Sequence, residues 1–283
     1  MSDPRAGHLV LVTTPIGNAR DITLRALDLL REATVLVAED TRSLRRLMDM
    51  HGVAVGGRPL LAYHDHSGPR MRDKVLDHLA AGALVVYASE AGTPLIADPG
   101  YDLVQVARAA GHGVTAAPGP SAAVTALSLA GLPTDRFFFE GFLPSAKGAR
   151  RKVLQSLTAV PGTLIFYESP KRLEKSLSDM AEILGPARAA VIARELTKRF
   201  EEIRSAALGD LVQLVVEAPP KGEIVVLVGP AAAAEISPED ITEMLTEALA
   251  SQSAKDAVAQ VSAATGAPRR QVYKEALAIL GKS

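Results

Sequence analysis

The stretch at residues 84–94, Leu84-Val85-Val86-Tyr87-Ala88-Ser89-Glu90-Ala91-Gly92-Thr93-Pro94, joins a short apolar run to a polar segment that contains glycine and proline. A short run rich in β-branched residues is typical of a strand that is buried on both faces of a parallel sheet. Beyond it, Asp98 and Pro99 have the chemistry of a helix start, and apolar residues recur at helical spacing as far as Gly111. The stretch therefore predicts a ligand-binding loop that carries Glu90 at the carboxyl end of a central strand. A loop that only turns the chain is the alternative.

The composition is that of a globular protein with room for two domains. Hydrophobic residues make up 48% of the 283 residues, and the formal net charge is -1. Because there is no cysteine, neither a disulfide framework nor a thiolate metal site is available. No run approaches the roughly 20 apolar residues of a membrane span, and the N-terminus lacks a signal-peptide pattern. We expect a soluble cytoplasmic protein in which only local basic patches contact phosphate backbones.

Residues 1–119 are predicted to form one doubly wound α/β domain. Five strand-like runs alternate with helical patterns, and one predicted helix begins at Asp21 with Leu24, Leu27 and Leu30 on one face. Polar residues collect where the strands end. The predicted strands lie at residues 9–12, 34–38, 60–62, 84–88 and 114–117.

A second domain is predicted over residues 120–230, after the natural hinge Pro118-Gly119-Pro120. Its sheet is expected to be mixed, because the strand at residues 201–206 returns without an intervening helix. An alanine-rich linker and three short helices follow over residues 231–283. The last two helices resemble a helix-turn-helix, which fits either a packing or dimer element or a nucleic-acid reader.

Two polar clusters have more than one interpretation. The sequence His64-Asp65-His66 lacks a third ligand at a characteristic spacing, so we predict a substrate-facing loop and no metal. Asp40 and Arg42 form either a local ion pair at a helix start or part of an active site. Glu168 and Glu195 follow strands of the second domain, and together with the first-domain loops they could line one cleft between the domains.

Seven ordered motifs between residues 8 and 229 resemble those of the tetrapyrrole-methylase superfamily. Within it, the chain is most similar to the bacterial enzymes that methylate the 2′-oxygen of a cytidine in 16S ribosomal RNA. The resemblance implies two α/β domains with a cofactor cleft between them, plus a small helical extension. The motifs are Thr14-Pro15-Ile16-Gly17-Asn18, Ala38-Glu39-Asp40-Thr41-Arg42, His64-Asp65-His66, residues 89–100, Pro118-Gly119-Pro120-Ser121, Phe166-Tyr167-Glu168-Ser169 and residues 193–198.

The cofactor that the resemblance implies is S-adenosylmethionine. Glu90 stands where the subfamily usually has aspartate, so the carboxylate is kept with one more methylene. Small residues would let the backbone approach the ligand, because methyl transfer chiefly needs alignment of the reacting atoms. The implied cofactor-binding residues are Pro15, Gly17, Ser89, Glu90, Ala91, Thr93, Pro118, Gly119, Ser121, Ala122, Tyr167 and Ala193.

The implied substrate is 16S ribosomal RNA within the small ribosomal subunit, and the implied assembly is a homodimer without membrane contact. We predict that His64, Lys147, Arg150, Arg151 and Lys152 contact the RNA. A small-molecule methyltransferase that acts on a tetrapyrrole-like acceptor, and a non-catalytic ribosome-assembly protein, are the alternatives. The sequence shows no unmistakable base for the ribose hydroxyl. The candidate catalytic residues are Asp40 and Arg42, followed by Glu195 and Lys198.

Overall fold

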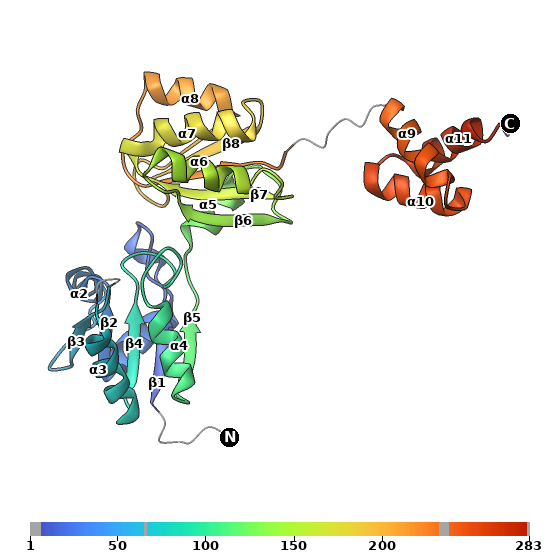
Figure 1. The fold of residues 1–283 in the computed structure, drawn as a ribbon. Helices are drawn as coiled ribbons and strands as arrows, with labels where there is room; N and C mark the ends of the chain where they lie inside the picture. The colour runs from blue at the N-terminus through green and yellow to red at the C-terminus, as the bar shows by residue number, and fades with distance from the viewer. Residues whose placement is uncertain (1–6, 65–66, 232–237, 282–283) are drawn as a thin grey trace. The chain divides into compact units, whose positions relative to one another are not determined.

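The first sheet has the predicted short apolar run at its centre. The structure is a computed structural model that describes residues 7–64, 67–231 and 238–281 (Figure 1). Five parallel strands pair in the order β3-β2-β4-β1-β5. Residues 85–88 of β4 are fully buried, so the predicted central strand is confirmed. The strands are β1 (His8–Val12), β2 (Val35–Ala38), β3 (Leu60–Ala62), β4 (Leu84–Ala88) and β5 (Gly113–Ala117).

Helices cover both faces of this sheet, which confirms the doubly wound arrangement (Figure 1). Leu30 and Leu44 pack with Val86 on one face, and Leu79 and Leu103 pack with Val85 on the other. Alternate residues of one strand thus enter two separate cores. The helices are the short 3-10 helix η1 (Ala19–Asp21), α1 (Leu24–Glu32), α2 (Thr41–Met50), α3 (Pro69–Ala80) and α4 (Tyr101–Ala109).

The helix start predicted at Asp98 is wrong. Helix α4 begins at Tyr101, and its N-cap is Gly100 with a φ of 115°. A Cβ at Gly100 would lie 3.0 Å from Cε1 of Tyr87, so both the left-handed backbone and the close approach favour glycine. Tyr87 donates its hydroxyl to the carbonyl of Pro99 at 2.8 Å. The residues after β4 therefore form a longer, anchored loop than the sequence predicted.

The helix predicted from Asp21 also begins later. Thr23 caps α1 by accepting a hydrogen bond from the amide of Ala26 at 3.1 Å. Asn18 caps the preceding 3-10 turn in the same way through Arg20. Leu24 is 81% exposed, because it stands at the first position of α1 and not on the buried stripe.

The second sheet is mixed, as predicted. Strands β6 and β7 are parallel, whereas the remaining neighbours in the order β6-β7-β10-β8-β9 are antiparallel. Helix α5 packs on one face, and α6, α7 and α8 pack on the other. The elements are α5 (Ala122–Leu129), β6 (Phe137–Phe142), α6 (Lys147–Ser156), β7 (Thr163–Glu168), α7 (Pro170–Leu184), β8 (Ala189–Arg194), β9 (Glu202–Ala207), α8 (Leu208–Glu217) and β10 (Ile224–Val228).

Both sheets belong to one compact unit, Met1–Pro230. Ile16, in the loop after β1, is buried in the core that α5 forms with the second sheet, so the two halves of this unit share side-chain packing. Residue 120 lies between β5 and α5, and a domain boundary there remains our proposal.

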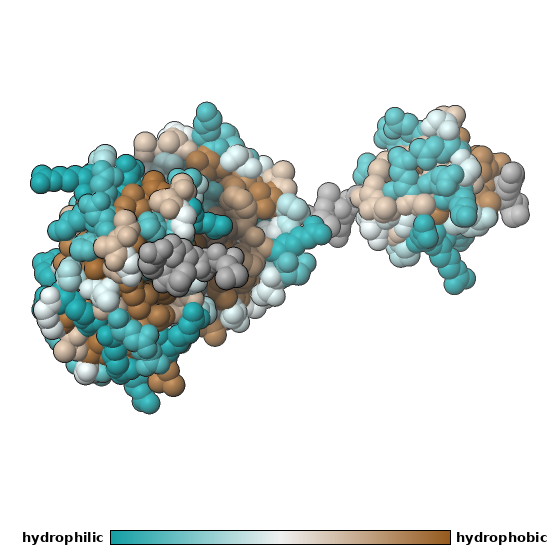
Figure 2. All heavy atoms as spheres, turned by 90° about the horizontal axis from the view of Figure 1, so that it is seen from below, coloured by the Kyte–Doolittle hydropathy of each residue, from teal (hydrophilic) through white to brown (hydrophobic). Residues whose placement is uncertain are grey.

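A second unit is Ala231–Ser283, and the structure describes three helices in it, over residues 238–281. They are α9 (Pro238–Leu249), α10 (Ala254–Thr265) and α11 (Arg269–Ile279), and they share a core that includes Leu245, Val261 and Val272. Gly266 ends α10 with a φ of 71°. The face of this unit seen in Figure 2 is largely hydrophilic. Most of the predicted linker lies outside the described residues, and none of the described helices is long and apolar enough to span a membrane.

Candidate active site

The polar loops after β1 and β4 meet at a topological switch point. These strands are neighbours, but the chain leaves β1 for β2 and leaves β4 for β5, so the two loops diverge from one crevice. Thr14 and Gly92 exchange two backbone hydrogen bonds of 3.0 Å across it. Ser89 donates its hydroxyl to the carbonyl of Gly92 at 2.6 Å. These bonds hold the two loops in a fixed arrangement.

A cleft of about 790 Å³ opens over these loops and is closed on its other side by residues of the second sheet. This volume is typical of sites for small ligands and cofactors. Pro118 and Gly119 were also predicted to bind the cofactor, and they lie in the turn between β5 and α5. A Cβ on Gly119 would lie 3.0 Å from Cβ of Thr13. Ten predicted cofactor-binding residues line the cleft: Pro15, Gly17, Ser89, Glu90, Ala91, Thr93, Ser121, Ala122, Tyr167 and Ala193.

The N-terminus of α5 is open toward the cleft. Its N-cap, Ser121, makes no side-chain capping hydrogen bond, and Ser121 and Ala122 both line the cleft. Backbone amides at such a helix start favour anionic groups. Tyr167 lies beside it, where burial raises the pKa of the phenol and the amide of Ala123 donates a hydrogen bond to it. The phenol therefore stays neutral at physiological pH.

Lys198 places a cation in the cleft wall. Its Nζ lies 3.0 Å from Oε1 of Glu195 and 3.0 Å from Oε2 of Glu223. Burial alone would lower the pKa of Lys198, but the hydrogen bonds to the two carboxylates outweigh it and raise the pKa overall. The backbone amide of Glu223 and the ammonium of Lys198 in turn lower the pKa of Glu195. Glu195 is therefore a weak base that orients Lys198.

Gly17 allows this cation to approach the loop after β1. A Cβ at Gly17 would lie 2.6 Å from Cγ of Lys198 and 2.7 Å from Oγ1 of Thr197. The amide of Asn18 donates to Oγ1 of Thr197 at 3.0 Å. Glu195 and Thr197 have φ values of 51° and 64°, in the left-handed region that non-glycine residues rarely occupy. The strained loop is thus held tightly against Gly17.

Asp40 and Arg42 form the ion pair at a helix start that was the alternative to a catalytic pair. Asp40 caps α2 by accepting from the amide of Arg42 at 2.8 Å, and Nη2 of Arg42 lies 2.9 Å from Oδ2 of Asp40. The Arg42 side chain and amide lower the pKa of Asp40 to about 2. A carboxylate so acidic is a poor general base at neutral pH. It is their neighbours Glu39 and Ser43 that line the cleft.

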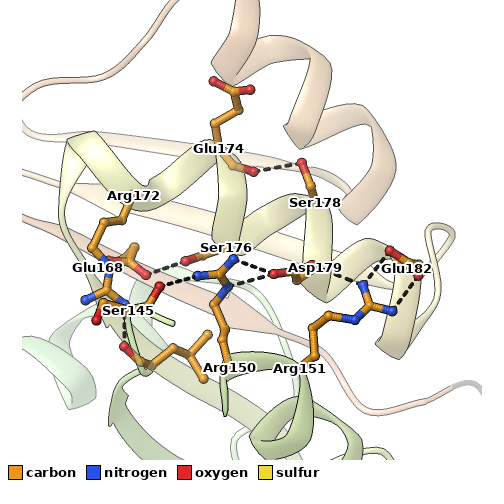
Figure 3. Close-up of polar contacts among 11 residues, drawn as sticks. Ser145, Arg150, Arg151, Glu168, Arg172, Glu174, Ser176, Ser178, Asp179 and Glu182 are labelled. Atoms are coloured by element: carbon orange, nitrogen blue, oxygen red, sulfur yellow. Dashed lines mark hydrogen bonds and ion pairs between the residues drawn. The ribbon is translucent and has the colours of Figure 1, made fainter. Parts of the chain in front are cut away.

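The basic side chains of α6 have two different environments: the two arginines form ion pairs with α7 (Figure 3), and the two lysines are exposed. Arg150 is only 5% exposed, and its Nη2 lies 2.6 Å from Oδ2 of Asp179 on α7. The prediction that Arg150 contacts RNA is therefore wrong. Arg151 bridges Asp179 at 3.1 Å and Glu182 at 2.5 Å, so its guanidinium also joins α6 to α7. Lys147 and Lys152, on the same helix, are exposed.

Glu168, at the end of β7, is buried in the cleft wall, and Figure 3 shows it pointing toward Ser176 and Arg172. Its carboxylate accepts hydrogen bonds from the amide of Ser169 at 2.8 Å and from the hydroxyl of Ser176 at 2.5 Å. Nε of Arg172 lies 3.3 Å away. The sequence placed Glu168 near a cleft but gave no sign of these partners.

Sequence reasoning missed the contribution of α2 to the cleft. Arg46 and Met50 of α2 line the cleft, and the sequence analysis named neither of them as a site residue. His64 lines a smaller, separate pocket. Asp65 and His66 lie outside the described residues, within which no group of three or more histidine or acidic side chains is placed to hold a metal ion.

Comparison with known proteins identifies the family. Residues 8–212 match the family model described as Tetrapyrrole (Corrin/Porphyrin) Methylases. The chain belongs to this family. Residues 235–280 match a second model, described as the RsmI C-terminal HTH domain. The resemblance inferred from the motifs and the predicted fold class are both confirmed.

Curated relatives match almost the whole chain. Ribosomal RNA small subunit methyltransferase I of Mesorhizobium japonicum is 46% identical over 97% of this chain and 92% of its own length. The Escherichia coli O157:H7 protein of the same name is 44% identical over 98% and 96%. Among solved structures, uroporphyrin-III C-methyl transferase from Thermus thermophilus, complexed with S-adenyl homocysteine, shares the fold with a TM-score of 0.55 at 22% identity, covering 79% of this chain and 97% of that one.

Proposed function

We propose that this tetrapyrrole methylase family member transfers a methyl group from S-adenosylmethionine to the ribose 2′-oxygen of a cytidine in 16S ribosomal RNA. The observation that carries the proposal is the cleft of about 790 Å³ at the switch point, which is lined by ten of the cofactor-binding residues that the resemblance implies. The names of the curated relatives support ribosomal RNA of the small subunit as the substrate.

The cleft suits the methyl donor in shape and chemistry. Ala91, Gly92 and Ala122 leave room for a ligand against the backbone, and the start of α5 offers backbone amides to a carboxylate. Glu90 is exposed on the cleft wall, where its carboxylate can accept hydrogen bonds from hydroxyl or amino groups. When bound, S-adenosylmethionine supplies an electrophilic methyl group. The task of the protein is then to align the acceptor oxygen with it.

We assign charge stabilisation at the acceptor oxygen to Lys198. Asp40 and Glu195 both have lowered pKa values, so neither is matched to accept a proton near neutral pH. The raised pKa of Lys198 keeps an ammonium in the cleft wall, where it stabilises negative charge that develops on the 2′-oxygen. The hydroxyl proton then leaves to water. Glu195 acts through Lys198 as a positioning residue.

The RNA surface that we propose comprises exposed cations of α6 and of the loop after β8. Lys147 and Lys152 project from α6, and Arg199 follows Lys198 directly. Cations that neutralise phosphates bind RNA in a salt-dependent manner.

We also propose that the protein is a homodimer. Strand β6 is an edge strand, and its Phe137 and Phe138 are 49% and 41% exposed. Exposed aromatic side chains on an edge strand are typical of a surface that another chain covers. Sedimentation analysis of the purified protein, compared with a Phe137→Glu, Phe138→Glu variant, tests this. A wild-type monomer would overturn the dimer.

The function is tested by methyl transfer from labelled S-adenosylmethionine to three acceptors. These are small ribosomal subunits that lack the modification, naked 16S ribosomal RNA, and uroporphyrinogen III as a tetrapyrrole. We expect label in the RNA, released as a 2′-O-methylcytidine on digestion. Label in the tetrapyrrole alone would show a small-molecule methyltransferase, and no label in any acceptor would favour a non-catalytic assembly protein.

A further inference from the structure

A second pocket of about 280 Å³ adjoins the cleft, between the loop after β3 and the start of α4. Asp98 lines both cavities, so the pocket and the cleft share one wall. Other lining residues are Tyr63, His64 and Tyr101. The pocket is therefore a neighbour of the cleft, close enough for a nucleotide next to the one in the cleft.

The inner wall of the pocket is rigid. Tyr63 is only 2% exposed and packs edge-on against Tyr87, with ring centroids 6.1 Å apart. Its hydroxyl donates to the Asp102 carboxylate, with O–O distances of 2.8 and 2.7 Å. Burial and this hydrogen bond raise the pKa of Tyr63, so the phenol remains a donor. The Asp102 side chain, still 50% exposed, keeps acceptor capacity on the pocket side.

The outer wall offers an aromatic surface. Tyr101 is 67% exposed at the first position of α4. Gln105, one turn further along, donates from Nε2 to the Tyr101 hydroxyl at 3.0 Å and so restrains the ring. Nη1 of Arg72 lies 4.0 Å from Oδ2 of Asp102, so its positive charge partly offsets the negative charge of that carboxylate.

An exposed aromatic ring beside a fixed carboxylate is the arrangement that recognises an unstacked nucleobase. Single-stranded RNA is bound by stacking its bases on aromatic side chains and by hydrogen bonds to their edges. Carboxylates accept hydrogen bonds from exocyclic amino groups, which cytosine, adenine and guanine carry and uracil does not.

We propose that this pocket holds a nucleobase that flanks the methylated nucleotide, stacked on Tyr101, and that Asp102 selects a base with an exocyclic amino group. The inference rests on the proposed RNA methyltransferase function and extends it to substrate specificity. His64, predicted from the sequence to contact substrate, lines this pocket and not the main cleft. Its placement fits a contact with the flanking nucleotide.

Stacking is tested with Tyr101→Ala, and Tyr101→Phe is the matched control. The probe is a fragment of 16S ribosomal RNA containing the modified cytidine. Because stacking of one base contributes a factor of roughly 5–150 in affinity, we expect Tyr101→Ala to raise the KM for RNA by about that factor. Tyr101→Phe keeps the ring and should stay near wild type, as should the affinity of every variant for S-adenosylmethionine. An unchanged KM in Tyr101→Ala would overturn the inference.

Selection by Asp102 is tested with RNA fragments in which each neighbour of the modified cytidine is replaced in turn by uridine. We expect one replacement to impair wild-type methylation, and Asp102→Asn to discriminate less at that position. Equal discrimination by both proteins would refute the role of Asp102. If the wild-type protein methylates no RNA at all, the proposed function fails, whereas normal wild-type activity with an unaffected Tyr101→Ala variant rejects only the nucleobase pocket.

Discussion

Replacing Arg150 by alanine should destabilise the protein without changing how it binds RNA. Arg150 is 5% exposed, and its Nε and Nη2 donate to the Asp179 carboxylate while Nη1 donates to the carbonyl of Ser145. Removing one partner of a buried ion pair costs about 3–5 kcal/mol, because the remaining charge is left incompletely paired. For a unit of this size, that corresponds to a fall in Tm of roughly 6–20 °C.

The matched variant is Lys152→Ala, on the same helix but exposed. It should leave Tm within about 2 °C, since surface substitutions rarely change the free energy of unfolding by more than about 0.5 kcal/mol. If Lys152 contacts a phosphate, its loss reduces the slope of log affinity against log salt concentration by about one. Thermal unfolding and RNA binding at several salt concentrations measure both effects. A stable Arg150→Ala variant with a reduced salt slope would refute this division of roles.

Three further outcomes follow from the cleft geometry. Gly17→Ala introduces a Cβ 2.6 Å from Cγ of Lys198, so we expect a lower kcat with little loss of RNA affinity, and an unchanged kcat would show that the loop yields freely. Lys198→Met should reduce the rate of single-turnover methylation by roughly 10–1,000-fold, which is the range for other electrostatic stabilisers, and Glu195→Gln should reduce it by less. Equal rates in the wild-type protein and both variants would show that Lys198 has no role in the mechanism. Asp40→Asn should keep methylation near the wild-type rate at pH 7. Because the folded pKa of Asp40 is about 2, its stabilising contribution is present above the unfolded pKa near 3.8 and is lost as pH falls through 2, so the two proteins should unfold more alike near pH 2 than at pH 7.

Local sequence patterns predicted the sheets well because burial on both faces leaves few alternatives. The residues of β4 are apolar throughout, and the five predicted strands of the first domain all form. The first residue of a helix was harder to predict where a local capping pattern in the sequence competed with tertiary contacts. Asp98-Pro99 reads as a cap and first position, yet packing against Tyr87 moves the start to Gly100 and Tyr101.

The candidate site shows what a linear pattern omits. The sequence showed that the segment at α6 is basic, but it could not show which acidic residues pair with the arginines, because Asp179 is 29 residues from Arg150 in sequence. In the same way, the lowered pKa of Asp40 depends on the geometry of its bonds to Arg42. The cofactor loops were found because several motifs at strand ends converge on one edge of a parallel sheet, which is a property of the fold.

The most direct test of the account is a calorimetric titration of S-adenosylmethionine into wild type, Glu90→Ala and Glu90→Asp. Glu90 lies on the cleft wall at the end of the central strand. Loss of a hydrogen bond to a charged group costs about 1.5–3 kcal/mol, so Glu90→Ala should bind roughly 10–150-fold more weakly. Glu90→Asp should bind nearly as well as wild type. Equal affinity of wild type and Glu90→Ala, or no binding by wild type, would contradict the proposed cofactor site.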